Sequence, residues 1–172
     1  MRDVERLRRD AANTYERGRL VMGLRVTAVV LPLALLCARE SGEWRRCAAV
    51  SVMLLLVAVF ARWRLPRGVR SVDAGLLSGA LPMSCALVLC RFAWWWPDGA
   101  ALGICAAAGF ASGLFAGRVT VGTPQWTIAA LVSGLTAALG CVGIGVGTAI
   151  GSTAAVAAGA VTVARLPSRV RI

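Results

Sequence analysis

The chain has 172 residues, of which 58% are hydrophobic and only 16% are charged, and its net charge is +11. Soluble domains are about 45–50% apolar and about 25% charged, so this composition excludes an ordinary soluble globule and requires a surface that faces lipid. All 19 basic residues are arginines, and most lie directly beside apolar segments. Arginines placed there orient a membrane protein and contact anionic headgroups, which argues against nucleic acid as a partner.

The first segment in chain order is a polar arm, residues 1–19, which is unlike a cleavable signal peptide. Apolar residues recur along it at helical spacing, and this pattern predicts a short amphipathic helix in the cytoplasm. Two roles stay open, an anchor on anionic lipid and a docking helix for a cytoplasmic protein. The residues expected to make either contact are Arg2, Arg6, Leu7, Arg8, Arg9 and Tyr15.

The rest of the chain predicts an all-α integral membrane bundle. A helix needs about 20 residues to cross a bilayer, and apolar segments of about this length are found at 20–38, 44–61, 74–93 and 99–117. The uncharged run 126–164 is about twice as long. Glycines 143, 145 and 147 predict a turn within it, giving helices at 126–142 and 146–164 and a basic tail at 165–172. One long tilted helix, and hence five spans, is the alternative.

The distribution of arginine favours six spans with both termini in the cytoplasm, because cytoplasmic segments of membrane proteins are enriched in basic residues. In this arrangement fourteen arginines are cytoplasmic, four are outer, and Arg25 lies within the first span. The four outer arginines are Arg39, Arg45, Arg46 and Arg91. Five spans would move the last three arginines across the membrane and weaken the bias.

Glycines spaced four residues apart predict how the helices pack. Small residues allow membrane helices to approach closely, and G-x-x-x-G spacing puts them on one face. The ridges comprise Gly75 and Gly79, then Gly109, Gly113 and Gly117, then Gly143, Gly147 and Gly151. We favour packing within one chain, although the same ridges fit an interface between two copies in a homo-oligomer.

Residues that could carry chemistry are scarce. Histidine is absent, which removes the usual general base and the commonest metal ligand. No Asp or Glu falls inside a predicted span, where ionisable residues commonly mark functional sites. We therefore expect no enzyme activity, no bound metal and no cofactor.

The cysteines offer the sharpest hypothesis. Five of the six fall toward the outer ends of the predicted spans: Cys37, Cys47, Cys90, Cys105 and Cys141. In an oxidising compartment they could form one or more disulfides, or a thiol site that senses an oxidant or a soft metal ion. The alternative is that they are small apolar packing residues, because buried cysteine often has only that role.

The layout of a charged arm followed by six spans resembles the bacterial membrane-bound anti-sigma factors. The segment 130–141, which reads ALVSGLTAALGC, and the Gly/Ala-rich last helix with its closing arginine look like the C-terminal half of that family. The resemblance covers the last third of the chain and the general layout. It implies a protein of the bacterial inner membrane whose arm holds a sigma factor. The family often has a histidine before the cysteine, where this chain has Gly140.

The leading interpretation is a non-enzymatic regulatory membrane protein that lies in the lipid bilayer and binds a cytoplasmic partner, such as a sigma factor, through its arm. A small transporter or channel subunit that acts as a homo-oligomer is the second interpretation, and it requires a continuous polar pathway. An accessory subunit of a larger membrane complex is the third. The first interpretation requires a bundle with two states, the second requires a polar pathway through the spans, and the third requires neither.

Overall fold

The computed structural model describes residues 14–18, 20–21, 24–64, 68–92, 98–120 and 125–165. Every regular element in these ranges is an α-helix, so the predicted all-α class is confirmed. Most of the predicted arm, including Arg2, Arg6, Leu7, Arg8 and Arg9, and residues 166–172 of the predicted tail lie outside the described residues. The named helices are α2 (Thr27–Ser41), α3 (Trp44–Arg64), α4 (Gly68–Phe92), α5 (Asp98–Thr120), α6 (Trp126–Cys141) and α7 (Val146–Arg165).

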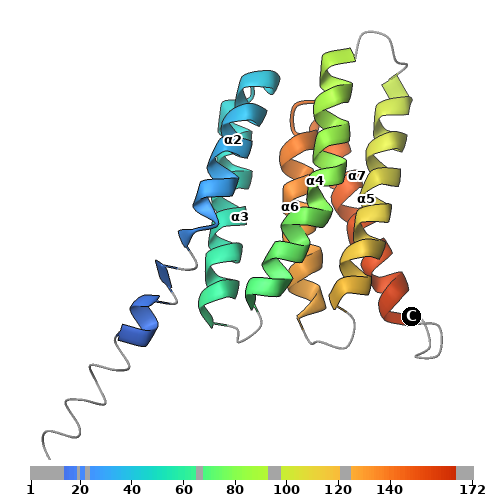
Figure 1. The fold of residues 1–172 in the computed structure, drawn as a ribbon. Helices are drawn as coiled ribbons and strands as arrows, with labels where there is room; N and C mark the ends of the chain where they lie inside the picture. The colour runs from blue at the N-terminus through green and yellow to red at the C-terminus, as the bar shows by residue number, and fades with distance from the viewer. Residues whose placement is uncertain are drawn as a thin grey trace, which may run out of the picture.

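The six helices run alternately up and down in one bundle (Figure 1). Four stretches of 20 to 23 residues are long and apolar enough to cross a membrane. They are Trp44–Arg64, Arg70–Phe92, Gly99–Thr120 and Val146–Arg165. Large apolar side chains such as Leu56, Leu77 and Ile150 are about two-thirds exposed on the outside of the bundle, as a lipid-facing surface requires. These features indicate an integral membrane protein.

Helices α2 and α6 are shorter, with 15 and 16 residues. The sequence pattern predicted the first helix at 20–38, whereas α2 begins later, at Thr27, after a turn at Arg25 and Val26. It also ends later, because Gly42 has φ +68° and its N–H donates to the carbonyl of Ala38. Glycine adopts this left-handed cap without strain, and hydrophobicity alone does not mark such a cap.

The long apolar run 126–164 folds as two helices, not one. Residues 142–145 form a turn between α6 and α7, and Gly145 has φ +153°. The hydroxyl of Thr148 closes this turn by donating to the carbonyl of Gly145 at 2.7 Å. The predicted reversal at the glycine-rich stretch is therefore present, and a single long helix is not.

The core of the bundle consists of α4, α5, α6 and α7. Helix α5 packs most extensively against α7, and α4 packs against α6. Helix α6 contacts each of the other five helices and is buried along much of its length, so this short helix is largely covered by protein. Helices α2 and α3 form a hairpin at one edge of the bundle and reach the core mainly through α3 (Figure 1).

Glycines on α4 and α5 lie where the core helices approach most closely. A Cβ atom placed at Gly75 would lie 2.7 Å from the carbonyl oxygen of Ala129, and one at Gly109 would lie 2.6 Å from that of Ser152. Gly79, Gly113 and Gly117 are similarly close to α6 or α7. Both ridges therefore face neighbouring helices of the same chain.

The third predicted ridge does not make such contacts. Gly143 lies in the turn between α6 and α7, a Cβ at Gly147 would meet no atom within 4 Å, and one at Gly151 would meet only Leu102 at 3.9 Å. The close contact on α7 is made at Gly159, which lies against the backbone of α5 at Phe110 and Leu114. The spacing of glycines shows which residues share a face but not which face meets a neighbour.

We predict that Gly113→Ala destabilises the bundle, because the added methyl group would collide with the backbone of Val156. Overpacking of this kind costs about 1–3 kcal/mol, so the midpoint of thermal unfolding in detergent falls. Gly147→Ala is the matched control, since its methyl group enters open space. Equal midpoints for the two variants would contradict this account of α5 and α7.

Candidate functional site

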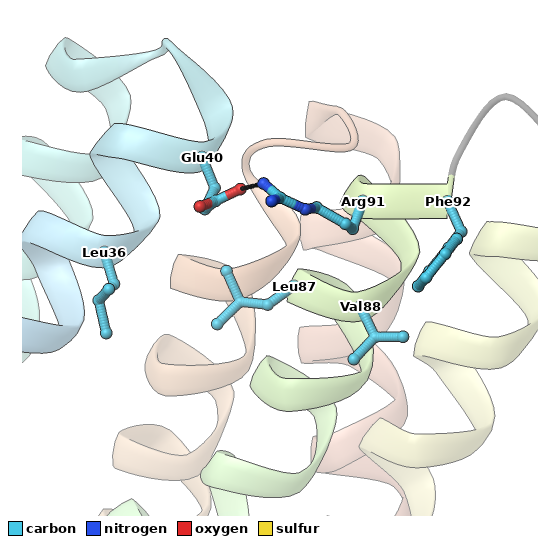
Figure 2. Close-up of a pocket in the computed structure, with 6 residues that line it drawn as sticks. All are labelled: Leu36, Glu40, Leu87, Val88, Arg91 and Phe92. Carbon is cyan, nitrogen blue, oxygen red and sulfur yellow. Dashed lines mark hydrogen bonds and ion pairs between the residues drawn. The ribbon is translucent and has the colours of Figure 1, made fainter.

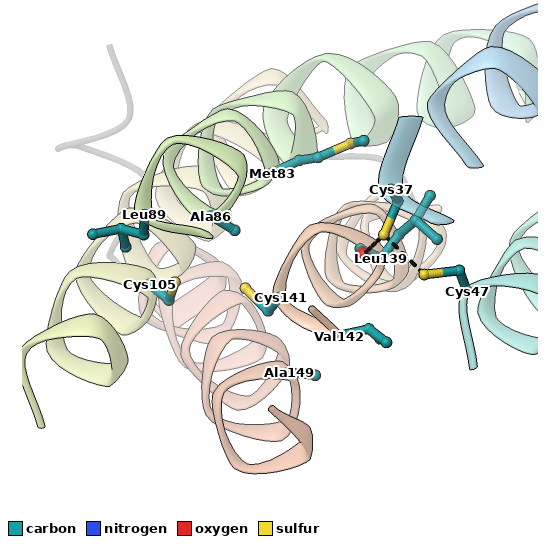
Figure 3. Close-up of a cluster of buried hydrophobic side chains, with 10 residues drawn as sticks. All are labelled: Cys37, Cys47, Met83, Ala86, Leu89, Cys105, Leu139, Cys141, Val142 and Ala149. Carbon is teal, nitrogen blue, oxygen red and sulfur yellow. Dashed lines mark hydrogen bonds between the residues drawn. The ribbon is translucent and has the colours of Figure 1, made fainter. Parts of the chain in front are cut away.

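The antiparallel arrangement gathers the five predicted cysteines at one end of the bundle. This end comprises the last turns of α2, α4 and α6 and the first turns of α3, α5 and α7. Four of the cysteines are buried in a single hydrophobic cluster with Met83, Ala86 and Leu139 (Figure 3). They are Cys37, Cys47, Cys105 and Cys141, while Cys90 is half-buried near the end of α4.

Cys37 and Cys47 face each other across the α2–α3 hairpin. Their sulfur atoms are 3.0 Å apart, and each residue is only 1% exposed. The Cys37 thiol also donates to the backbone carbonyl of Leu139 on α6, at 2.6 Å. The turn at Gly42 lies midway between the two cysteines in sequence, so the hairpin itself sets them opposite each other.

Cys105 and Cys141 form a second buried pair. Their side chains interact with each other and come from α5 and α6 (Figure 3). The structure contains no disulfide among the described residues, which include all six cysteines. Within those same residues, no three His, Cys, Asp or Glu side chains are grouped so as to hold a metal ion. Four of the six cysteines therefore lie in two pairs of free thiols.

Three serines join the core helices below this end. The hydroxyl of Ser112 on α5 lies 2.7 Å from that of Ser133 on α6, and it donates to the carbonyl of Ser78 on α4 at 2.7 Å. All three serines are buried. The sequence shows scattered serines without indicating which of them meet. Because these hydroxyls are bonded to protein groups, they hold helices together rather than lining a path for water.

Two ion pairs attach the α2–α3 hairpin to α4, one at each end. At the cysteine-bearing end Arg91 pairs with Glu40 of α2 at 3.3 Å, above an apolar cavity of about 320 Å³ between α2 and α4 (Figure 2). At the opposite end Arg62 of α3 pairs with Asp73 of α4. The Arg91–Glu40 pair is largely exposed, and exposed ion pairs contribute little, about 0–1 kcal/mol. The Arg62 side chain is only 12% exposed, so its pair with Asp73 is the more sheltered of the two.

The arm enters the described structure only at its end. Residues 14–18 are helical and exposed, and Tyr15 is the one predicted contact residue among them. A cavity of about 460 Å³ lies between this segment and α3, lined by Glu16, Arg17 and Trp63 among others. The last residues of the arm therefore lie beside the end of α3 that carries Arg62, and not at the cysteine-bearing end.

No protein-family model, curated protein or solved structure matches this chain. The resemblance of its layout to the anti-sigma factors is therefore not tested by any matched relative. The function proposed below rests on the chain's own residues and contacts.

We predict that Ser112→Ala lowers the stability of the bundle, because Ser133 and the Ser78 carbonyl both lose a partner. Hydrogen bonds between membrane helices contribute about 0.6 kcal/mol on average and at most about 2, so the fall is of that size. Ser84→Ala is the control, since Ser84 is exposed and bonds only within its own helix. Chemical unfolding in mixed micelles measures the difference, and an equal effect of the two changes would refute the proposed role of Ser112.

Proposed function

We propose that this chain crosses a bacterial inner membrane six times, with both termini in the cytoplasm, and acts there as a regulator without enzyme activity. Four long apolar helices support the membrane location. Helix α6 is too short to span a bilayer core alone, at about 24 Å against about 30 Å. It is enclosed by the other helices, however, and joins α7 through a tight turn, which supports counting it as a span.

The observation that carries a regulatory role is the unequal attachment of the two parts of the bundle. The close contacts at Gly75, Gly109 and Gly113 all lie between the core helices α4 to α7. The α2–α3 hairpin contacts the core through two ion pairs, the thiol of Cys37 and an apolar cluster in which Leu54 and Ala58 of α3 pack with Val72 of α4 and Val132 of α6. The core helices therefore pack against each other more extensively than the hairpin packs against them.

Residues 20–26 connect the arm to α2, so we propose that a displacement of the hairpin changes where the arm is presented. A ligand or signal shifts a protein between two states only if it favours one of them, and a displaced α2–α3 hairpin is the second state that we propose. The arm's arginines and its apolar residues Leu7 and Tyr15 fit a docking helix for a cytoplasmic protein. A sigma factor is the partner that we propose.

We do not propose a transporter or channel subunit. That function requires a polar path through the spans, whereas the buried hydroxyls of Ser78, Ser112 and Ser133 are hydrogen-bonded to protein groups. The close packing of α5 on α7 leaves no room for a Cβ atom at Gly109, Gly113 or Gly159.

The proposed topology is tested with reporters fused at residue 172 and within residues 93–97. Six spans predict that green fluorescent protein is fluorescent at residue 172, where alkaline phosphatase is inactive. At 93–97 phosphatase is active and fluorescence is absent, because that loop faces the periplasm. Active phosphatase at residue 172 would require an odd number of spans and would refute the proposal.

The proposed partner is tested by purifying the full-length protein from bacterial membranes and measuring co-purified sigma factors by mass spectrometry. We expect a sigma factor with the wild type and its loss in a variant carrying Leu7→Asp and Tyr15→Asp, which removes the apolar face but keeps every arginine. The control carries Arg169→Gln and Arg171→Gln in the tail and should retain the partner. Absence of a sigma factor from the wild type, or equal recovery with the arm variant, would count against the proposal.

A further inference from the structure

Cys37 and Cys47 are arranged as a pair that needs only a small movement to become bonded. Their sulfur atoms are 3.0 Å apart, against about 2.05 Å in a disulfide. They belong to successive antiparallel helices, and the turn between them, at Gly42 and Glu43, keeps the two backbones close. The approach of the two sulfurs therefore requires side-chain rotation and a slight shift of the hairpin, not a refolding.

The same thiol also links the hairpin to the core. Cys37 donates to the carbonyl of Leu139, which lies in the last turn of α6. Carbonyl groups in the last turn of a helix lack intrahelical donors and depend on other groups to satisfy them. A disulfide has no S–H group, so oxidation of Cys37 removes the hydrogen that this carbonyl accepts.

We propose that Cys37 and Cys47 form a reversible dithiol–disulfide couple, and that its oxidation loosens the α2–α3 hairpin from α6. This inference rests on the proposed function, since it names the signal that would act on the regulator. The proposed oxidant is a disulfide, either a small molecule or a protein, on the outer side of the membrane.

The thiol–disulfide exchange takes place in two steps. The thiolate of one cysteine attacks the oxidant R–S–S–R, forming a mixed disulfide and releasing one thiolate of R. The second cysteine then attacks the mixed disulfide, forming the Cys37–Cys47 bond and releasing the other. The two protons of the cysteines end on the two R–SH molecules. The cysteine pair is oxidised by two electrons, and the oxidant is reduced by two.

Access to the pair is through the first turn of α3. Cys47 is buried, but Trp44, Arg45 and Arg46 in the same turn are exposed. Opening of that turn at the end of the bundle presents the Cys47 sulfur to the oxidant, which makes Cys47 the attacking residue. Cys105 and Cys141 lie in the same cluster without a connecting hairpin, so they serve as the matched comparison.

The first test treats the full-length protein in lipid nanodiscs with oxidised glutathione and maps disulfides by mass spectrometry. We expect a Cys37–Cys47 link that dithiothreitol reverses. A variant carrying Cys105→Ser and Cys141→Ser should still form it. A wild type that retains both thiols, or that stops at a glutathione adduct on either cysteine, would overturn the couple.

The second test measures amide hydrogen exchange in α2 and α3 relative to α4–α7. Exchange in the hairpin should be slow in the reduced wild type and in Cys37→Ser, whose hydroxyl still donates to Leu139. It should be faster in the oxidised wild type and in Cys37→Ala, which lacks a donor. Cys47→Ala keeps the Cys37 donor, so amide exchange in its hairpin should stay slow in the presence of the oxidant.

A link that forms without faster exchange in the hairpin would overturn the proposed coupling to α6. If Cys37→Ala fails to fold, the comparison of the oxidised and reduced wild type still tests whether oxidation speeds amide exchange in the hairpin. Neither test depends on the arm or on its partner. Failure of the redox couple is therefore distinguishable from failure of the proposed partner.

Discussion

Lipid tails are as apolar as leucine side chains, so the helices of this bundle gain little from apolar burial against one another and depend on close backbone contact. Gly109 and Gly113 allow α5 to lie against the backbone of α7, and Gly159 allows the same approach from the opposite side. Gly75 and Gly79 do so for α4 on α6. These contacts define two helix pairs, and the pairs form the four-helix core by packing α6 against α7 and α4 against α5.

The close contacts at glycine join only α4, α5, α6 and α7, so the α2–α3 hairpin is the part of the bundle that they do not hold. The α2–α3 hairpin packs at the edge of the core, and its polar attachments are ion pairs at two ends and one thiol hydrogen bond. The hairpin also packs against Val72 and Val132 of the core, but it shares less contact with the core than the core helices share with one another. The cysteine pair lies at the attachment to α6, which is why we propose that its oxidation acts on the hairpin.

Much of the fold could be predicted from the sequence, because lipid imposes strong constraints on helix length and charge. Apolar segments bounded by arginine mark helices, and Trp44 and Trp126 each begin one. The break between α6 and α7 could also be predicted from the glycines at 143, 145 and 147. The start of α2 and the choice of contact glycine on α7 could not, because these depend on which face of a helix meets a neighbour.

The sequence predicts that the five cysteines lie toward one end of the bundle, but not which of them are in contact. The alternating direction of the helices puts these cysteines at one end. Cys37 and Cys47 are each five residues from Gly42, and this spacing about a turn predicts that the two side chains face each other. The sequence contains no signal for Leu139, since a backbone carbonyl acquires its role only when another helix approaches it. The same holds for Ser112 and Ser133, which are ordinary residues until α5 and α6 bring their hydroxyls together.

By itself, the sequence determined that this protein is a helical membrane bundle, because composition and charge placement depend on the solvent and not on the partners of each helix. The tertiary structure decided which helices form the core, which glycines are in contact, and which two thiols are neighbours. Those choices depend on distances between segments far apart in the chain, and the order of residues does not contain such distances.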